Sequence, residues 1–222
     1  KEPNLLPSPH YKHALSYNGF FMQKLVIATG NQGKLHELQT LLQDLPIELI
    51  TQKSLGISDA DETGLTFVEN ALIKARHAAS ISGLPALADD SGLCVDVMNG
   101  EPGIYSARYA GAGAKDSTNN EKLLHHLLPF RGEQPIKAQF VCVLVFLRHA
   151  NDPLPIICQG IWHGEILPAK QGDNGFGYDP LFWLPERGCS SAELEPSLKN
   201  QISHRGQAMA QLKAALVGLT LT

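Results

Sequence analysis

The residues best placed to do chemistry in this 222-residue chain are two adjacent carboxylates, Asp89 and Asp90. They follow an apolar run at residues 83–88 and precede Ser91 and Gly92. Burying an isolated charge costs several kcal/mol, so the pair should be satisfied by a divalent cation or by a cluster of hydrogen-bond donors. Asp and Ser also favour turns, because their side chains bond to the local backbone. The segment therefore fits either a structural turn or a metal site.

A second group of carboxylates lies in a loop predicted at residues 55–64, which contains Asp59, Asp61 and Glu62. Charges of one sign this close together repel one another unless water or a shared cation separates them. Exposed loops are commonly acidic, so a solvated loop and a metal-binding segment are both consistent with this pattern.

An anion site is indicated where the first strand meets the first helix. The apolar run at residues 25–28 predicts a buried strand, residues 29–33 predict a tight turn, and the apolar spacing from Lys34 onward predicts a helix. Such a turn directs backbone N–H groups and the positive end of a helix dipole into one volume, which suits a phosphate. Lys34 adds a full positive charge there. The spacing of Gly30 and Gly33 matches neither the Walker loop nor the G-x-G-x-x-G pattern.

The helix after the acidic loop is predicted by a capping box, in which Thr66 is the N-cap and Glu69 follows three residues later. This helix extends to about residue 80. Lys74 lies on its polar side, away from the apolar stripe. Lys74 is therefore either solvated or directed toward the acidic loop or a bound anion.

The later elements complete the predicted framework. Thr118 and Glu121 form a second capping box, which predicts a helix through residue 128 with buried leucines. The apolar, β-branched run at residues 138–147 predicts a central strand, and residues 155–165 predict its hairpin partner. This order of strands and helices indicates an α/β protein with a mixed β-sheet flanked by helices.

Two further segments are candidates for binding a ligand. Residues 172–180 combine three glycines with Phe176 and Tyr178, which suits either a planar ligand or a tight turn with two packing aromatics. Ser203 is the expected N-cap of the last helix, so His204 and Arg205 lie in its first turn. Positive side chains there oppose the helix dipole, and such a local conflict is expected where a protein binds an anion.

Composition limits the possible partners. A net charge of −4 and a pI near 6.1 argue against nucleic acid or an anionic membrane as the main partner, because both favour a basic surface. No apolar run approaches the roughly 18 residues that a membrane span needs. The four cysteines form no C-x-x-C motif and are expected to be reduced thiols in a cytoplasmic protein: Cys94, Cys142, Cys158 and Cys189.

The N-terminal residues differ from the rest of the chain. Residues 1–21 contain three prolines and show no periodicity, which predicts a tail or N-terminal extension outside the fold. The folded pattern begins with Met22, so residues 22–222 are predicted to form a single domain.

Four motifs occur together in this order: T-G-N-x-x-K at residues 29–34, A-D-D-S-G at 88–92, G-F-G-Y-D-P at 175–180 and K-x-x-x-S-H-R at 199–205. From about residue 22 to residue 217 the sequence resembles the inosine/xanthosine triphosphate pyrophosphatase family. The resemblance implies an elongated two-lobed α/β fold with the active site in the cleft, and a homodimer. It also implies Mg²⁺-dependent cleavage of purine nucleoside triphosphates such as ITP, dITP and XTP into monophosphate and pyrophosphate, which removes them from the nucleotide pool.

The same resemblance implies roles for individual residues. Asp90 corresponds to the general base that also binds metal, with Asp89 beside it. Asp61 and Glu62 correspond to the second metal-binding segment, and either of them could be the ligand because relatives often carry Glu at the position of Asp61. The residues implied to bind substrate are Thr29, Gly30, Asn31, Gln32, Gly33, Lys34, Lys74, Ser91, Phe176, Gly177, Tyr178, Asp179, Lys199, His204 and Arg205.

Two other functions remain open at this point. A related pyrophosphatase could act on modified pyrimidines or on 7-methyl-guanosine triphosphate, although the G-F-G-Y-D-P and S-H-R segments favour the purine branch. The chain could also be a non-catalytic nucleotide sensor, but such a protein would have little use for Asp89 and Asp90 beside an acidic loop.

Overall fold

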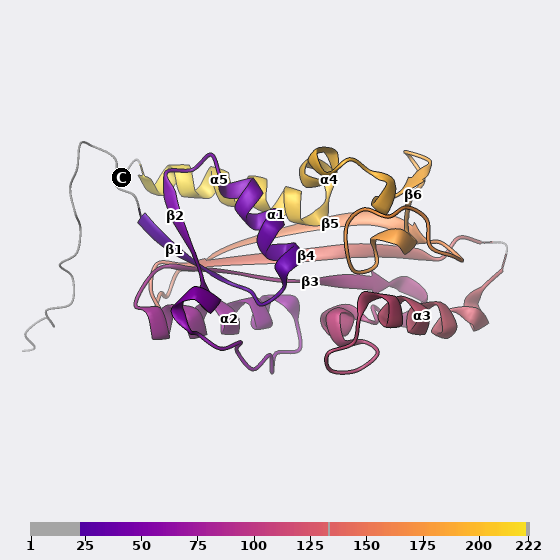
Figure 1. Ribbon diagram of the computed structural model, residues 1–222, viewed down its shortest axis with the longest axis horizontal. Helices are drawn as coiled ribbons and strands as arrows, with labels where there is room; N and C mark the ends of the chain where they lie inside the picture. The colour runs from indigo at the N-terminus through magenta and orange to yellow at the C-terminus, as the bar shows by residue number, and fades with distance from the viewer. Residues whose placement is uncertain (1–22, 133, 221–222) are drawn as a thin grey trace, which may run out of the picture.

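The computed structural model describes residues 23–132 and 134–220, which form a seven-stranded sheet with helices on both faces (Figure 1). The strands lie in the order β2, β1, β3, β4, β5, β6, β7; β2, β1 and β3 are parallel, and the remaining neighbours are antiparallel. Their bounds are β1 Gln23–Ala28, β2 Ile47–Thr51, β3 Ala86–Val95, β4 Lys137–Leu147, β5 Ile156–Ile166, β6 Phe182–Leu184 and β7 Cys189–Ser190. This arrangement confirms the predicted α/β class with a mixed sheet.

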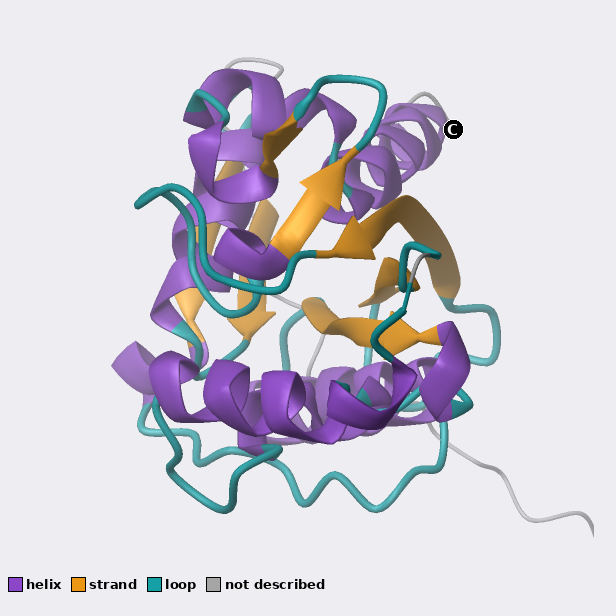
Figure 2. Cartoon of the chain, turned by 90° about the vertical axis from the view of Figure 1, so that its right-hand side faces the viewer, coloured by secondary structure: helices purple, strands orange, loops and turns teal. Residues whose placement is uncertain are grey.

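The helices form one layer on each face of the sheet, as the end view in Figure 2 shows. One layer contains α1 (Gln32–Leu42) and α5 (His204–Thr220), and the short α4 (Pro196–Ile202) precedes α5. The opposite layer contains α2 (Phe67–Ser82) and α3 (Asp116–His126). The molecule is elongated along β3, β4 and β5, its three longest strands (Figure 1).

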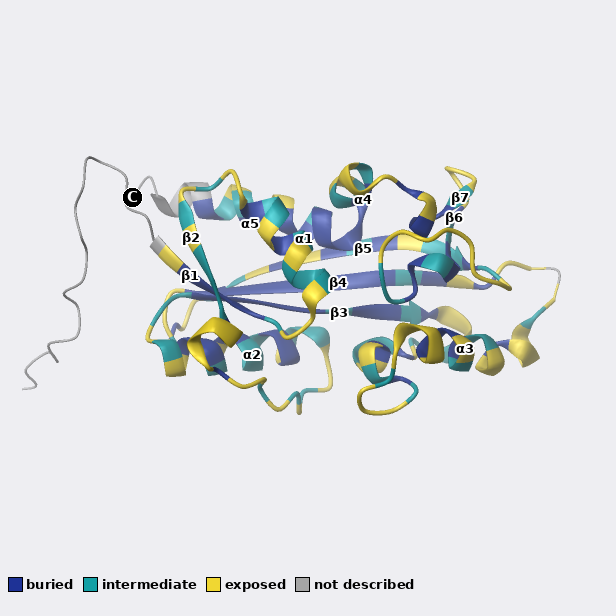
Figure 3. Ribbon diagram, in the orientation of Figure 1, coloured by how far each residue is buried: buried dark blue, intermediate teal, exposed yellow. Residues whose placement is uncertain are grey.

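Alternate residues of β1 pack against the helix layers on opposite faces of the sheet. Leu25 and Ile27 pack in the core cluster that contains residues of α1 and α5. Val26 and Ala28 pack in the cluster that contains the alanines of α2. A third cluster joins α3 to β3, β4, β5 and β6. The central strands are accordingly buried along most of their length (Figure 3).

The interpretation of the carboxylate pair as a turn is wrong. Asp89 and Asp90 lie in the middle of β3, which pairs with β4 along its whole length. Asp89 is opposite Leu144 and Asp90 is opposite Val143 in this antiparallel register. A strand interior can hold two carboxylates here because each one meets cationic side chains from other elements.

The predicted helix starts have mixed outcomes. Helix α1 begins at Gln32, slightly before the predicted start. Thr66 caps α2 as predicted, since its Oγ1 accepts a hydrogen bond from the Glu69 backbone N at 3.2 Å. The second predicted capping box is wrong, because Lys115 is the N-cap of α3 and Thr118 lies inside the helix. Leu128 is 62% exposed, contrary to prediction, because α3 ends at His126.

Three further predictions concern the chain as a whole. The proposed extension at residues 1–21 lies outside the described residues, so its separation from a single two-lobed domain at 22–222 stays a prediction. Within residues 23–132 and 134–220, no helix has both the length and the apolar character that crossing a membrane requires. All four cysteines are free thiols.

Candidate active site

Asp89 is a fully buried anion held by cations from two helices. Neighbouring residues of a strand point to opposite faces, so β3 directs Asp89 and Asp90 to different surroundings. The Asp89 carboxylate lies 3.2 Å from Lys34 Nζ and 3.4 Å from Arg205 Nη2. Burial alone would raise the pKa of Asp89, but the charges of Lys34 and Arg205 outweigh it and hold this pKa well below its usual range. Asp89 is therefore charged at neutral pH.

Asp90 has the opposite electrostatic balance. Its Oδ1 accepts a hydrogen bond from Lys74 Nζ at 2.9 Å, whereas its buried Oδ2 has no hydrogen-bond partner within residues 23–132 and 134–220. Burial raises the pKa of Asp90, and the nearby charges of Lys74 and Lys34 offset this rise only in part. A carboxylate with a raised pKa and a free lone pair is suited to accept a proton from a water molecule.

Lys74 connects Asp90 to the acidic loop. Its Nζ also donates to Glu62 Oε1 at 2.9 Å, and Arg108 Nη1 donates to Glu62 Oε2 at 2.7 Å. Burial would raise the pKa of Glu62, but Lys74 and Arg108 lower it overall, so Glu62 is an anion. The alternative in which Lys74 reaches the acidic loop is therefore the one found in the structure.

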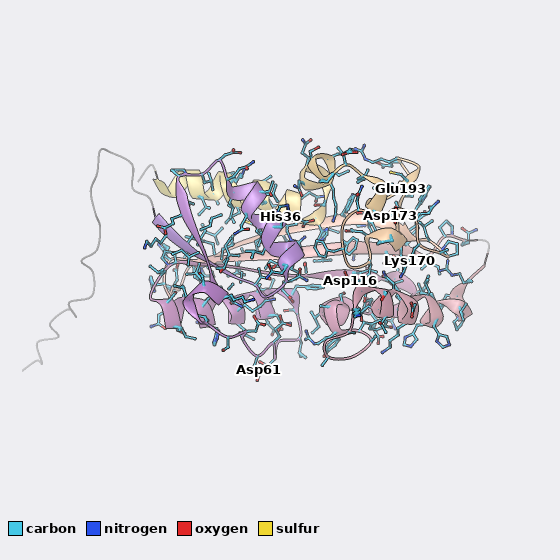
Figure 4. The ribbon with its side chains drawn as sticks, viewed as in Figure 1. His36, Asp61, Asp116, Lys170, Asp173 and Glu193 are labelled. Atoms are coloured by element: carbon cyan, nitrogen blue, oxygen red, sulfur yellow. The ribbon has the colours of Figure 1, made fainter. Side chains whose placement is uncertain are left out.

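The three predicted metal-binding carboxylates are not gathered into one cluster. Asp61 is exposed and lies at the outer edge of the acidic loop (Figure 4), whereas Lys74 separates Glu62 from Asp90. Among the described residues, no three His, Cys, Asp or Glu side chains are close enough to hold a metal ion together. Of the two adjacent carboxylates in this loop, Glu62 is the one that shares a partner with Asp90.

The predicted anion turn caps helix α1. Asn31 is the N-cap and its Oδ1 accepts from the Lys34 backbone N at 3.0 Å. At Gly30 a Cβ would lie 2.8 Å from Asp59 Oδ2, and at Gly33 a Cβ would lie 2.8 Å from the Phe176 ring. A side chain at either position would therefore displace Asp59 or Phe176. Gly33 thus allows the turn to lie against residues 172–180, here called the glycine–aromatic segment.

Two adjoining cavities are lined by most of the predicted residues. The first, of about 430 Å³, joins the anion turn to the acidic loop, Lys74 and Asp90. The second, of about 190 Å³, is lined by the glycine–aromatic segment, Lys199, His204 and Arg205. Asn31, Lys34 and Ser91 line both cavities, so the two lie side by side. Three predicted residues line neither cavity: Gln32, which is exposed, Gly33, and Asp89, which is buried.

The glycine–aromatic segment is organised by Asp179. Its Oδ2 accepts from Lys199 Nζ at 2.6 Å and from the Phe176 backbone N at 2.9 Å. Tyr178 is buried, and its hydroxyl donates to the Ser106 carbonyl at 2.8 Å, which anchors the segment to the 3-10 helix Gly103–Arg108. Phe176 is only partly buried, so its ring faces the second cavity.

His204 and Arg205 begin helix α5, and Ser203 caps it as predicted by accepting a hydrogen bond from Gly206. Burial and the charges of Arg205 and Lys199 lower the pKa of His204 well below its usual value, so the imidazole is neutral. His204 stacks on Phe140 with ring centroids 4.8 Å apart, and its buried Nδ1 has no hydrogen-bond partner in the part of the chain that the structure describes.

Sequence reasoning missed two carboxylates of this site. Glu37, one helical turn after Lys34, accepts hydrogen bonds from both Lys199 and Arg205. Asp116, at the start of α3, accepts from the Gly177 backbone N at 2.6 Å and lies beside the glycine–aromatic segment (Figure 4). The position of Glu37 next to Lys34 on α1 was visible in the sequence, but its partners are more than 160 residues away.

The fold and the geometry of this site together indicate a class of protein. One of the two adjoining cavities is lined by the predicted anion turn, two lysines and Asp90, and the other by the partly buried Phe176 ring and by buried polar groups. These are the features of an α/β protein that binds a phosphorylated ligand with a planar group.

Comparison with known proteins identifies the family. The profile of the Ham1 family matches residues 25–215, and the chain belongs to this family. A dITP/XTP pyrophosphatase of Acinetobacter baumannii (strain ATCC 17978) is 60% identical over 201 residues, which cover 89% of this chain and 97% of the relative. The corresponding protein of Vibrio cholerae serotype O1 is 56% identical over 195 residues, 88% and 97% of the two chains.

A solved structure of a HAM1 protein from Coxiella burnetii has a TM-score of 0.83 and 49% identity, covering 89% of this chain and all of the other. The Ham1 protein of Staphylococcus aureus has a TM-score of 0.77 at 42% identity, with 88% and 99% coverage. The family resemblance of the sequence motifs is thus confirmed.

Proposed function

We propose that this chain hydrolyses noncanonical purine nucleoside triphosphates, ITP, dITP and XTP, to the monophosphate and pyrophosphate. The observation that carries this proposal is the position of Asp90, which lines the cavity of the predicted anion turn next to Ser91, a residue that also lines the cavity with the Phe176 ring. The curated names of the Acinetobacter and Vibrio relatives, dITP/XTP pyrophosphatase, support the same substrates.

Different residues of the site have different roles in phosphoanhydride hydrolysis. The turn from Thr29 to Gly33, together with Lys34, binds and orients the phosphates through backbone N–H groups and positive charge. Asp90 takes the proton of the attacking water, because its pKa is raised and its Oδ2 is free. Asp89 remains charged and holds Lys34 and Arg205 in place.

Residues that could hold Mg²⁺ are present. The Oδ2 of Asp90, which has no partner among the described residues, and the carboxylate of Glu62 are hard oxygen donors of the kind that Mg²⁺ prefers. Mg²⁺ usually keeps several waters and uses one or two carboxylates together with substrate phosphates, so this pair is sufficient. When bound there, the cation would neutralise the charge that develops on the phosphates.

Base selection belongs to the second cavity. The 6-keto oxygen of hypoxanthine or xanthine requires hydrogen-bond donors, and the cationic groups of Lys199 and Arg205 and the neutral ring of His204 line this cavity. Adenine carries an amino group at the same position and would leave such donors unpaired, which disfavours it. The ring of Phe176 offers a stacking surface for the base.

We further propose that the protein is a homodimer and is cytoplasmic. Its ligand is the nucleotide, and neither nucleic acid nor a membrane is a main partner. The negative net charge argues against nucleic acid or an anionic membrane, and the free cysteines fit a cytoplasmic protein. The homodimer rests on the family resemblance alone.

A substrate panel tests the function. The purified chain is incubated with ITP, dITP, XTP, ATP and GTP, with Mg²⁺ or with EDTA, and pyrophosphate and orthophosphate are measured separately. We expect pyrophosphate release from ITP, dITP and XTP only with Mg²⁺, and slower release from ATP. Equal turnover of ATP and ITP would contradict the keto-selective pocket, and release of orthophosphate would contradict cleavage between the α and β phosphates.

A further inference from the structure

Lys74 occupies the position between the two carboxylates that are suited to a divalent cation. Its Nζ lies 2.9 Å from Glu62 Oε1 and 2.9 Å from Asp90 Oδ1. The three residues come from separate elements, namely the acidic loop, helix α2 and strand β3. The Lys74 side chain is only 13% exposed, so this contact lies inside the cavity and not on the solvated surface.

An ammonium group in this position competes directly with a metal ion. It uses one oxygen of each carboxylate, and Mg²⁺ would have to approach those carboxylates to about 2.0–2.1 Å. The two cations would repel one another at that distance. The cluster is also already balanced in charge, because Lys74 and Arg108 face Glu62 and Asp90.

The same cavity offers Lys74 another anion. The anion turn at residues 29–31 and Lys34 line it, so phosphates bound there would lie beside the Lys74 side chain. The four-carbon stem of lysine is flexible and lets the ammonium exchange partners without backbone movement.

We infer that Lys74 holds the place of the divalent cation in the free protein and must leave Glu62 and Asp90 before a cation binds them. The inference rests on the proposed function for the identity of the phosphate-bearing ligand. The free protein therefore binds divalent metal weakly. Substrate phosphates draw Lys74 away and make both carboxylates available, which couples metal binding to nucleotide binding.

Metal binding to the nucleotide-free protein tests this inference without measuring activity. Mn²⁺ is titrated into the full chain and free Mn²⁺ is followed by electron paramagnetic resonance. Lys74→Met is expected to bind Mn²⁺ at least about tenfold more tightly than the unmodified chain, a change of about 1.4 kcal/mol. Lys74→Arg keeps a cation in place and is expected to bind as weakly as the unmodified chain.

Lys34→Met is the matched control for loss of charge alone. Lys34 faces Asp89, the neighbouring carboxylate, at 3.2 Å and lines the same cavity. We expect its removal to change the Mn²⁺ affinity by less than about threefold, because it frees no oxygen of Glu62 or Asp90. An equal gain in Lys34→Met and Lys74→Met would overturn the inference in favour of a general charge effect.

Further variants test whether the gain in Mn²⁺ affinity arises at Glu62. Glu62→Gln combined with Lys74→Met should lose the gained affinity, which places the ion at Glu62. Circular dichroism verifies folding, and Lys74→Gln serves as a second neutral variant if Lys74→Met does not fold. An unchanged Mn²⁺ affinity in the folded neutral variants, with ITP hydrolysis by the unmodified chain intact, would overturn this inference alone. A gained affinity without any hydrolysis of the panel substrates would contradict the proposed function alone.

Discussion

Asp89 and Asp90 are neighbours in the sequence with opposite electrostatic environments. The pKa of Asp89 is lowered because two cations outweigh the effect of its burial, whereas the pKa of Asp90 is raised because burial dominates. Two carboxylates whose pKa values are pushed apart in this way can take different roles, one as a permanent anion and one as a proton acceptor. The division follows from strand geometry, which sends the two side chains to opposite faces of β3.

We predict that Asp90→Asn retains the fold and loses activity by at least about two orders of magnitude, because general bases typically contribute 10²–10⁴-fold. Pyrophosphate release from ITP measures the loss, and circular dichroism reports the fold. Asp96→Asn is the matched control, since Asp96 is exposed just beyond the end of β3 and should retain full activity. Turnover near that of the unmodified chain in Asp90→Asn would refute the role of Asp90.

A second prediction concerns the buried neutral ring of His204. An unfolded histidine titrates near about pH 6.5, whereas the pKa of folded His204 lies well below its usual value. Below about pH 6.5 the unfolded chain therefore binds a proton here that the folded chain does not. Stability should fall as pH decreases, by up to about 1.4 kcal/mol per pH unit.

Urea unfolding at several pH values between about 6.5 and 5 measures this slope, above the range where unfolded carboxyl groups titrate. His204→Gln should have a flatter pH dependence, while His163→Gln, at an exposed position of β5, should keep the slope of the unmodified chain. Equal slopes in both variants would show that His204 is not the group responsible.

At the scale of elements, local sequence signals were reliable only where no tertiary contact competed with them. The Thr66 capping box was predicted correctly, because the box and the apolar stripe after it agree. The Thr118 box failed because α3 begins earlier, where Asp116 bonds to Gly177, and because the buried Asn119 and Asn120 set which side of the helix faces inward. The partners in those contacts lie in other parts of the chain, so the sequence around Thr118 does not indicate them.

This difference gives a paired prediction. Thr66→Ala removes the hydroxyl that accepts from the Glu69 backbone N and should reduce the free energy of unfolding by about 1 kcal/mol. Thr118→Ala should be neutral or slightly stabilising, because Thr118 is exposed inside α3 and alanine has the higher helix propensity. Urea unfolding at neutral pH compares the two, and an equal loss in both variants would contradict the assigned N-cap of α3.

At the scale of the whole molecule, the sequence motifs identified most of the residues in the cleft, while their partners came only from the fold. Glu37 meets Lys199 and Arg205 because α1 and α5 lie on the same face of the sheet. The bond between Lys74 and Asp90 depends in the same way on α2 packing against β3. Spacing along a chain shows which side chains are chemically able to act, but packing of distant elements decides which of them form pairs.

Strand β4 joins all three core clusters into one unit. Phe140 belongs to the cluster with α3, Leu144 to the cluster with α1 and α5, and Val143 to the cluster with α2. Because one strand carries residues of every cluster, no cluster can unfold without exposing part of another. We therefore expect the described fold to unfold in a single cooperative transition.

Leu38→Ala tests this cooperativity. Leu38 is a fully buried residue of α1. The two tryptophans lie elsewhere, Trp162 in the cluster with α3 and Trp183 in β6, a strand that contributes to the same cluster. The substitution should cost about 2–5 kcal/mol and should shift the denaturation midpoints of tryptophan fluorescence and of circular dichroism by the same amount. Leu154→Ala, at a position 72% exposed, is the control and should shift neither. If the fluorescence midpoint stayed in place while the circular dichroism midpoint moved, the clusters would be independent, and the cleft would lie between two separately unfolding parts.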